Sequence, residues 1–374
     1  MEVTVTKGLP QDYDELIDFG NMVFKEDFRA LLPKLYQDHP EAAAHHHLIR
    51  EDGRIKAMVG SFPITLKAAG RTLKVRGIGT VSVHPYARGR GYMKTLMGNA
   101  VKEAEAEGAA LMILGGQRQR YEYFGFTCCG VELDFSLSPS ARRHLRRFRD
   151  DSLTLVVLAD NKEYLRSCCQ LLERQPFYGV RPGVDFCDIV QSWNSVAYVI
   201  LKDGEFLGYC SLQEGRKVQE LFLEDYRYVI GAVLKIGELC KERVTVTALP
   251  FQQEMIHALN LVCDGQSVWP NPMVNVLDYP AVIEAYLTLK GQQVPLADGR
   301  LVICAEGKGC WAIEVKGGGV TVVPTNNPPQ VTLPHLQMMA YLFSPMGQAG
   351  AGVKTPETLS WLPIPLYVAN CDDV

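Results

Sequence analysis

The pattern of apolar and polar positions predicts two helices followed by an antiparallel sheet. The helices are expected at residues 13–24 and 28–36. The next segment, residues 45–83, is rich in β-branched and apolar residues and is interrupted by Asp52-Gly53 and Ala69-Gly70, which signal turns. These features predict a meander in which consecutive strands lie side by side.

A third helix is expected soon after this meander. Apolar residues recur there at the i, i+3, i+4, i+7 and i+8 positions that form one face of a helix. They are Met93, Leu96, Met97, Ala100, Val101 and Ala104. Gly108 follows as a stop signal, and the next apolar run, AALMILGG, predicts a strand. Together these elements predict a mixed α/β domain over residues 1–150, which is a common domain size.

The middle of the chain repeats this plan in a degraded form. AYVILKDGEFLGYCSLQ resembles the first hairpin, with its turn at Asp203-Gly204. KVQELFLEDYRYVIGAVLKIGELCKE and RVTVTALP resemble the strand, helix and strand that follow it. Two copies of one supersecondary unit are therefore expected, the second over residues 151–275. The copies differ where HPYARGRGY of the first becomes EDYRYVIG in the second, which lacks the closely spaced glycines.

A third region is expected from residue 276 onward, after the proline-containing sequence WPNPM, which predicts a linker. Its pattern predicts a helix at 281–289, strands in RLVICAEG, CWAIEVKGGGVTVVP and PQVTLP, and a helix in HLQMMAYLF. SPMGQAGAGVKTPE is expected to form a loop, and WLPIPLYVANCDDV is strand-like up to its acidic end. The predicted fold class is α/β in the broad α+β sense, with domains at 1–150, 151–275 and 276–374.

Length and composition agree with this division. A chain of 374 residues is too long for one small core, and 47% hydrophobic with 21% charged residues is ordinary for a globular protein. The formal net charge of −4 provides no general attraction to nucleic acid or to an anionic membrane. The sequence shows neither a secretory signal nor an apolar run of membrane-spanning length, so a cytoplasmic location is expected.

The cysteines and the clustered histidines do not predict a metal site. The eleven cysteines are scattered, their only close groupings are the adjacent pairs Cys128/Cys129 and Cys168/Cys169, and there is no CxxC motif. Buried, reduced thiols are expected instead. The triplet HHH at residues 45–47 points its side chains to different faces, so it predicts the entrance of a strand.

The junction GTVSVHPYARGRGYMKTLM changes from strand to helix within a few residues. Pro85 ends the strand, and the main-chain N–H groups at the start of a helix, together with its dipole, favour an anion. Gly89 and Gly91 allow close approach to a ligand, and Arg88 and Arg90 supply positive charge. Taken alone, these residues fit a phosphate site, and they equally fit a tight turn with solvated arginines.

VSVHPYARGRGYMKTLM resembles the acyl-CoA-binding motif of GNAT-type N-acetyltransferases, in which Arg/Gln-x-x-Gly-x-Gly/Ala joins a strand to a helix. Arg88 and Gly91 match this pattern, whereas Met93 stands at the last small position. The resemblance implies acetyl-CoA as co-substrate, with no metal. It implies that the strand pairs with the pantetheine arm, that the loop holds the pyrophosphate, and that two residues after the next strand lie beside the cofactor. The implied residues are Val81, Ser82, Val83, Arg88, Gly89, Arg90, Gly91, Tyr92, Met93, Lys94, Gly116 and Gln117.

A second matching motif is YEYFGF, in which Tyr121 stands four residues before Gly125. In enzymes of this type a tyrosine at that position protonates the departing coenzyme A thiolate, so the resemblance implies Tyr121 as general acid. Phenol and thiol pKa values near ~10 and ~8.5 are compatible with that proton transfer. The aromatic residues Tyr123, Phe124 and Phe126 are expected to pack in the core.

The order of an active GNAT domain, a degenerate one and a C-terminal sterol carrier protein-like domain resembles the enhanced-intracellular-survival acetyltransferases. The resemblance implies that the terminal carboxylate of Val374 reaches the active site of the first domain as the base. Asp372 and Asp373 add negative charge that favours a cationic substrate. The implied acceptor is an aminoglycoside, a polyamine-like amine or a lysine amine, and the implied assembly is a homo-oligomer, trimeric or hexameric.

Direct attack of the amine on the thioester is the expected mechanism, with main-chain N–H groups near Val83 polarising the carbonyl. A cysteine acyl-enzyme at Cys128 or Cys129 is disfavoured, because no histidine lies nearby in the sequence to activate either thiol. Glu26 and Asp27 are candidates for a cation-accepting cleft. Two alternatives remain, namely an acyl-CoA-sensing or lipid-binding module without enzymatic activity, and an acyltransferase for other acyl groups. The expected partner is a small-molecule or peptide amine, with no nucleic acid and no membrane.

Overall fold

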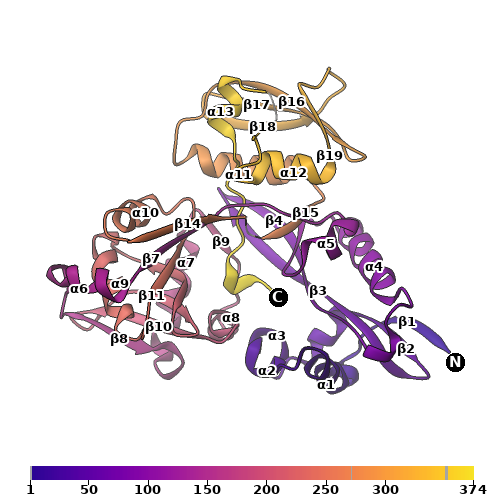
Figure 1. The fold of residues 1–374 in the computed structure, drawn as a ribbon, viewed down its shortest axis with the longest axis horizontal. Helices are drawn as coiled ribbons and strands as arrows, with labels where there is room; N and C mark the ends of the chain where they lie inside the picture. Colours follow the sequence, from indigo (N-terminus) through magenta and orange to yellow (C-terminus); the bar gives the residue numbers. More distant parts are fainter. Residues whose placement is uncertain (1, 271, 350–352) are drawn as a thin grey trace.

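The computed structural model describes residues 2–270, 272–349 and 353–374, and it arranges them in three sheets flanked by helices (Figure 1). The mixed α/β composition agrees with the predicted fold class. The third sheet and its helices lie above the junction of the first two, and the C-terminal segment descends from them between the first and second sheets (Figure 1). That segment brings the chain terminus to the candidate site.

The first sheet has eight strands, and its helices precede the meander and follow it. The sheet order is β1 (Val3–Lys7), β2 (His46–Glu51), β3 (Arg54–Ala68), β4 (Arg71–Val83), β5 (Leu111–Leu114), β15 (Met273–Val276) and β6 (Thr127–Cys128), with β9 (Phe177–Gly179) beside β3. The helices are α1 (Tyr13–Phe24), α2 (Phe28–Leu31), α3 (Pro33–Tyr36), α4 (Tyr92–Ala106) and α5 (Arg118–Tyr121).

Most predicted elements of this part are confirmed, with one exception. Helix α4 buries Leu96, Met97 and Ala100 of the predicted stripe, and the chain turns out of it at Gly108. The single helix expected at residues 28–36 is wrong, because it divides into α2 and α3 at Leu32. Pro33 disfavours helical geometry at the residue before it and lacks an N–H group to continue the hydrogen-bond ladder.

The second sheet has seven strands and repeats the plan of the first. Its order is β8 (Leu153–Val157), β10 (Ser195–Lys202), β11 (Glu205–Gln213), β12 (Lys217–Leu223), β13 (Val244–Ala248), β7 (Glu132–Leu137) and β14 (Gly265–Trp269). The helices are α6 (Pro139–His144), α7 (Leu165–Glu173), α8 (Phe186–Gln191), α9 (Val229–Gly237) and α10 (Gln253–Asn260). In both sheets a helix joins two parallel neighbours, β4 and β5 in one and β12 and β13 in the other. The predicted repeat is confirmed by this topology.

The two sheets exchange one strand each. β7 follows β6 along the chain but pairs with β13 of the second sheet, while β15 follows β14 and pairs with β5 of the first. The change of sheet therefore does not coincide with the predicted boundaries at residues 150 and 275. WPNPM, predicted as a linker, contains the last residue of β14 and the first of β15. The exchange ties the two domains together through main-chain hydrogen bonds.

The third sheet has four strands in the order β18 (Gly319–Pro324), β17 (Gly309–Lys316), β16 (Gly299–Glu306) and β19 (Val331–Pro334). Its helices are α11 (Tyr279–Gly291), α12 (His335–Phe343) and α13 (Pro356–Trp361). The apolar side chains of α12 are packed in the core. Cys304 and Cys310 form a disulfide between neighbouring strands, so the expectation of reduced thiols is wrong for this pair. The predicted loop SPMGQAGAGVKTPE lies partly outside the described residues.

The final segment is not the strand that its pattern suggests. After α13 the chain runs irregularly to a short 3₁₀ turn at Asn370–Asp372. Pro363 and Pro365 cannot donate to a strand ladder, which accounts for the difference. The segment is nevertheless buried at Ile364, Leu366 and Tyr367, so it is part of the core rather than a loose end. Among the described helices, none has the length and apolar character needed to cross a membrane.

Candidate active site

Strands β4 and β5 run parallel and then separate, and we call the point where they separate the fork. β4 and β5 pair from Val75↔Leu111 to Ile78↔Leu114, and within the described residues no later residue of β4 pairs with β5. On its other side β4 stays paired with β3 as far as Val83. A bulge interrupts that pairing, and Thr80 in β4 has a φ of 50°. The main chain from 79 to 83 therefore faces an opening between the strands, where an extended ligand can pair with it.

One cavity of about 760 Å³ occupies the open end of this fork. Its lining is Val23, Phe24, Val81, Ser82, Val83, Ala87, Arg88, Gly89, Gly91, Tyr92, Met93, Lys94, Arg120, Tyr123 and Phe124. We call it the cofactor cavity. Its described lining includes three cationic side chains and no acidic one, and residues at the N-terminus of α4 belong to it. Gly91 begins that helix with a φ of 77°, and no side chain caps the helix at this position. Unsatisfied N–H groups and positive charge together favour a phosphate group here.

Three predicted cofactor residues do not line this cavity. Arg90 donates to Glu51 at 2.6 Å, and the Tyr92 hydroxyl donates to the same carboxylate at 2.5 Å. These contacts lower the pKa of Glu51, the hydrogen bond from Tyr92 contributing most. Gly116 packs against the ring of Tyr121, and Gln117 is the residue before α5.

A second cavity of about 640 Å³ meets the first one at Phe24 and Val81. It is lined by Phe24, Glu26, Phe28, Leu31, Leu32, Ile78, Gly79, Thr80, Val81, Gly115, Tyr121, Trp193, Asn194, Gln213, Glu214, Gln219, Asn370, Asp373 and Val374. We call it the acceptor cavity. Its lining carries three acidic side chains and the chain terminus, but no lysine or arginine among the described residues. The two cavities therefore have linings of opposite charge and share two lining residues.

Tyr121 lines the acceptor cavity and packs in the same core cluster as Val81, one of the two residues that both cavities share. It ends helix α5, and its side chain is mostly buried against the core of the first domain. Burial raises the pKa of the Tyr121 hydroxyl, although Arg120 beside it opposes the shift. The phenol is therefore protonated at neutral pH, as a proton donor must be.

The C-terminal tail is fixed by cations from two domains. Arg181, which follows β9, donates from Nε to Asp372 Oδ1 at 2.8 Å and from Nη2 to Asp372 Oδ2 at 3.2 Å. The same guanidinium binds Glu220 of β12 at 2.7 and 2.8 Å and is 1% exposed. Lys34 of α3 donates to the main-chain carbonyls of Cys371 and Asp373. Burial lowers the pKa of Lys34 to about 8, against the opposing effect of Asp372.

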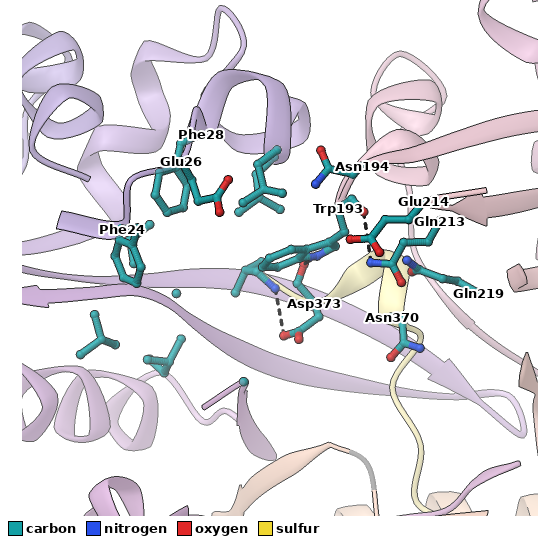
Figure 2. Close-up of a pocket in the computed structure, with 18 of the residues that line it drawn as sticks. Phe24, Glu26, Phe28, Trp193, Asn194, Gln213, Glu214, Gln219, Asn370 and Asp373 are labelled. Atoms are coloured by element: carbon teal, nitrogen blue, oxygen red, sulfur yellow. Dashed lines mark hydrogen bonds between the residues drawn. The ribbon is translucent and has the colours of Figure 1, made fainter. Parts of the chain in front are cut away.

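These contacts lay the last two residues across the fork. The main-chain carbonyl of Asp373 accepts a hydrogen bond from Trp193 Nε1 at 3.2 Å. The side-chain Oδ1 of Asp373 accepts one from the Val374 N–H at 2.9 Å (Figure 2). Val374 is 8% exposed, and a side chain at Gly79 would come within 2.9 Å of the Val374 carboxyl carbon. The terminal carboxylate therefore lies directly on the main chain of β4. The end of the chain is therefore held by contacts rather than frayed.

The second domain supplies one wall of the acceptor cavity, which the sequence interpretation missed. Trp193, Asn194, Gln213, Glu214 and Gln219 all line it, and Figure 2 shows several of them opposite Phe24, Glu26 and Phe28. No local motif marks these positions. The backbone of the structure does mark two of them as candidates for a functional site, because Trp193 and Asn194 have consecutive positive φ values of 63° and 56°.

Other candidate residues have different surroundings than expected. Glu26 lines the acceptor cavity, but Asp27 accepts hydrogen bonds from the N–H groups at the start of α2. Tyr123 is 67% exposed and lines the cofactor cavity, so the expectation of core packing is wrong for it, whereas Phe126 is fully buried.

Cysteine catalysis has little support in the surroundings of Cys128 and Cys129. Burial raises the pKa of both thiols, and Cys129 is completely buried. A raised pKa reduces the thiolate fraction that attack on a thioester needs.

Comparison with known proteins agrees with this geometry. Residues 5–129 match the family model described as acetyltransferase (GNAT) domain. No curated protein matches the chain. Three solved structures share the fold over most of the chain. One is a GCN5-related N-acetyltransferase from Anabaena variabilis, with 16% identity, 98% of each chain covered and a TM-score of 0.70. Another is Eis1 from Mycobacterium abscessus, with 13% identity, 98% of each chain covered and a TM-score of 0.65. The third is a GCN5-related N-acetyltransferase from Kribbella flavida, with 17% identity, 91% of this chain and 90% of that chain covered, and a TM-score of 0.64.

The family match covers the part of the chain that contains α4, Tyr121 and the fork. The N-terminal part is therefore an acetyltransferase domain of the GNAT type, and the protein is an acyltransferase. The full-length likeness to the solved structures extends the agreement to the fold of the remaining two domains.

Proposed function

We propose that the protein transfers an acetyl group from acetyl-CoA to a primary amine of a cationic substrate. The observation that carries this proposal is the pair of joined cavities with opposite charge, which meet at Val81 beside Tyr121. A basic cavity at a helix N-terminus suits the pyrophosphate of coenzyme A. An acidic cavity attracts an ammonium group such as that of an aminoglycoside, a polyamine or a lysine side chain.

The reaction proceeds by direct attack. The pantetheine arm pairs with the free edge of β4 at 81–83, which aims the thioester at the acceptor cavity. Once deprotonated, the amine attacks the thioester carbonyl, while main-chain N–H groups near Val83 stabilise the negative charge on its oxygen. The C–S bond then breaks, and Tyr121 donates its phenolic proton to the departing thiolate. The Val374 carboxylate accepts the proton that the ammonium gives up before the attack.

The protein further belongs, in this proposal, with the enhanced-intracellular-survival acetyltransferases. The fold shared with Eis1 over 98% of both chains supports that assignment. The third domain is then a sterol carrier protein-like domain whose contribution is to deliver the tail. The buried run of α12 agrees with a supporting role, because its side chains fill the core of that domain.

An acetyl-CoA turnover assay over a panel of aminoglycosides, polyamines and lysine peptides tests the proposal. The intact chain is compared with a chain that lacks its last three residues. We expect amine-dependent release of free thiol from the intact chain and a large loss of kcat on truncation. Binding of acetyl-CoA without turnover on any amine would contradict acetyl transfer, and equal activity of both chains would remove the tail from the mechanism.

A further inference from the structure

We propose that the acceptor ammonium is held and deprotonated by a pair of carboxylates, the Asp373 side chain and the Val374 terminus. Asp373 is then a third catalytic residue beside Tyr121 and Val374. This inference rests on the acetyl transfer proposed above and concerns the same site.

The geometry of the fork supports the pair. Ile78 and Leu114 are the last paired residues of β4 and β5, so Gly79 and Gly115 are the first residues beyond that pairing on the two strands. The carboxyl carbon of Val374 lies 2.9 Å from the position of a side chain carbon at Gly79. Asp373 Oδ2 lies 3.8 Å from the same position at Gly115. One carboxylate therefore lies against each strand where the fork opens, and both line the acceptor cavity.

Within the described part of the chain, no lysine or arginine side chain forms a hydrogen bond or ion pair with either carboxylate, although Lys34 lies near enough to act on Asp373. Arg181 is engaged by Glu220 and Asp372 through four hydrogen bonds of 2.7–3.2 Å. Lys34 donates to main-chain carbonyls of the tail rather than to the Asp373 carboxylate. An incoming ammonium can therefore provide the missing positive charge.

The environment of Asp373 also suits a base. Burial raises the pKa of the Asp373 carboxyl, while Lys34 and the Val374 N–H oppose the shift. The charged groups that act on it are Lys34 from α3 and Asp372 from the tail, and the cavity that it lines also contains the Val374 terminus, Glu26 and Glu214. Apart from Lys34 these are acidic, and a nearby like charge makes a carboxylate a stronger base.

The protons balance as follows. A primary ammonium carries three N–H protons, and the amide product keeps one of them. The first is lost to the carboxylate pair before attack and passes from there to solvent. The second is lost after the N–C bond has formed, and it restores the proton that Tyr121 gives to the thiolate when the C–S bond breaks. No oxidant, reductant or metal is needed.

Asp373→Asn tests the pair with little disturbance, because an asparagine oxygen can still accept the hydrogen bond from the Val374 N–H. We expect kcat to fall by about 10- to 100-fold, less than the roughly 10²- to 10⁴-fold that a sole general base contributes, because the Val374 carboxylate remains. The acid limb of the kcat/KM profile should move to lower pH, because the remaining carboxylate loses a like-charged neighbour. Asp373→Glu, which restores the charge, should recover part of the activity.

Two further variants separate the contributions of the terminal carboxylate and of Glu214 from that of Asp373. Adding one glycine after Val374 displaces the terminal carboxylate but keeps Asp373, and it should also lower kcat. Glu214→Gln removes a carboxylate from the opposite wall and should raise KM for the amine with a smaller effect on kcat. Resistance of the terminus to carboxypeptidase reports whether the tail of each variant remains docked.

The outcomes are distinct. If the intact enzyme acetylates amines and Asp373→Asn keeps its kcat and pH profile with the tail docked, Asp373 is not part of the base. If Asp373→Asn loses activity only together with carboxypeptidase resistance, the residue is structural and the pair is wrong. If the intact chain acetylates no amine, it is the proposed function that fails.

Discussion

The first and second domains share one topology but differ at the fork between their parallel strands. In the first domain the fork opens into a cavity of about 760 Å³. In the second, β12 and β13 separate after Val218↔Val246, and the side chain of Gln252 bridges the gap. It accepts from the Leu249 N–H at 2.9 Å and donates to the Leu221 carbonyl at 3.0 Å. The second fork is thus occupied by the chain itself.

The loops before α4 and α9 also differ between the two domains. In the first domain Gly91 precedes α4 without a side-chain cap. In the second, α9 likewise lacks a side-chain cap at Tyr228, but the turn before it begins with Asp225, whose carboxylate accepts from the Arg227 N–H, where the first domain has the His84 ring. A carboxylate at that position already satisfies a main-chain donor and repels a phosphate. The shared topology does not by itself make a cofactor site, because closely spaced glycines and a loop without a carboxylate are needed as well.

The second domain has instead become part of the acceptor site. It contributes Trp193 and Glu214 to the cavity wall, and it holds the tail through Arg181. The second domain, whose own fork is filled by Gln252, thus contributes side chains to the site of the first domain.

The largest expected effect tests whether only the first domain is catalytic. Tyr121→Phe removes the phenolic proton and should lower kcat about 100-fold while leaving the Kd for acetyl-CoA near its original value. Tyr226→Phe is the matched control, because the Tyr226 hydroxyl accepts from Gln252 in the closed fork. Steady-state kinetics and calorimetry distinguish the two variants. A parallel fall of kcat and affinity in Tyr121→Phe would mean that the residue has mainly a packing role.

The next effect tests the link from the second domain to the first. Arg181→Met leaves Glu220 and Asp372 buried without their cation, so the free energy of unfolding should fall by about 3 kcal/mol. The tail should become sensitive to carboxypeptidase, and kcat should fall about 10-fold while acetyl-CoA affinity is retained. Urea unfolding and proteolysis measure these changes. If the chain truncated by three residues loses further kcat when Arg181→Met is added, Arg181 acts through something other than the tail.

The smallest expected effect tests the glycine at the helix start. Gly91→Ala places a side chain at a φ of 77°, which costs about 1–2 kcal/mol, at a position that lines the cofactor cavity. Gly108→Ala imposes similar strain at a φ of 68° outside that cavity. Both variants should lose stability, but only Gly91→Ala should weaken acetyl-CoA binding severalfold. Equal affinity of the two variants would separate the loop from cofactor binding.

Local features of this protein were determined by the sequence alone. The stripe of α4, the turns of the meander, the glycine loop and the position of Tyr121 each depend on residues within one short segment. Hydrophobic period and backbone preference act over that range, so they predict these elements. The broken helix at Pro33 is the exception, although its cause is equally local.

The acceptor cavity was decided only by the tertiary structure. Its lining extends from Phe24 to Val374, and neither the strand exchange between the sheets nor the docking of the tail leaves a periodic signal in the sequence. The tail pattern even suggests a strand, while burial and the contacts of Arg181 and Lys34 hold it in an irregular path. Contacts between distant segments depend on how whole domains pack, and no short window of sequence contains that information.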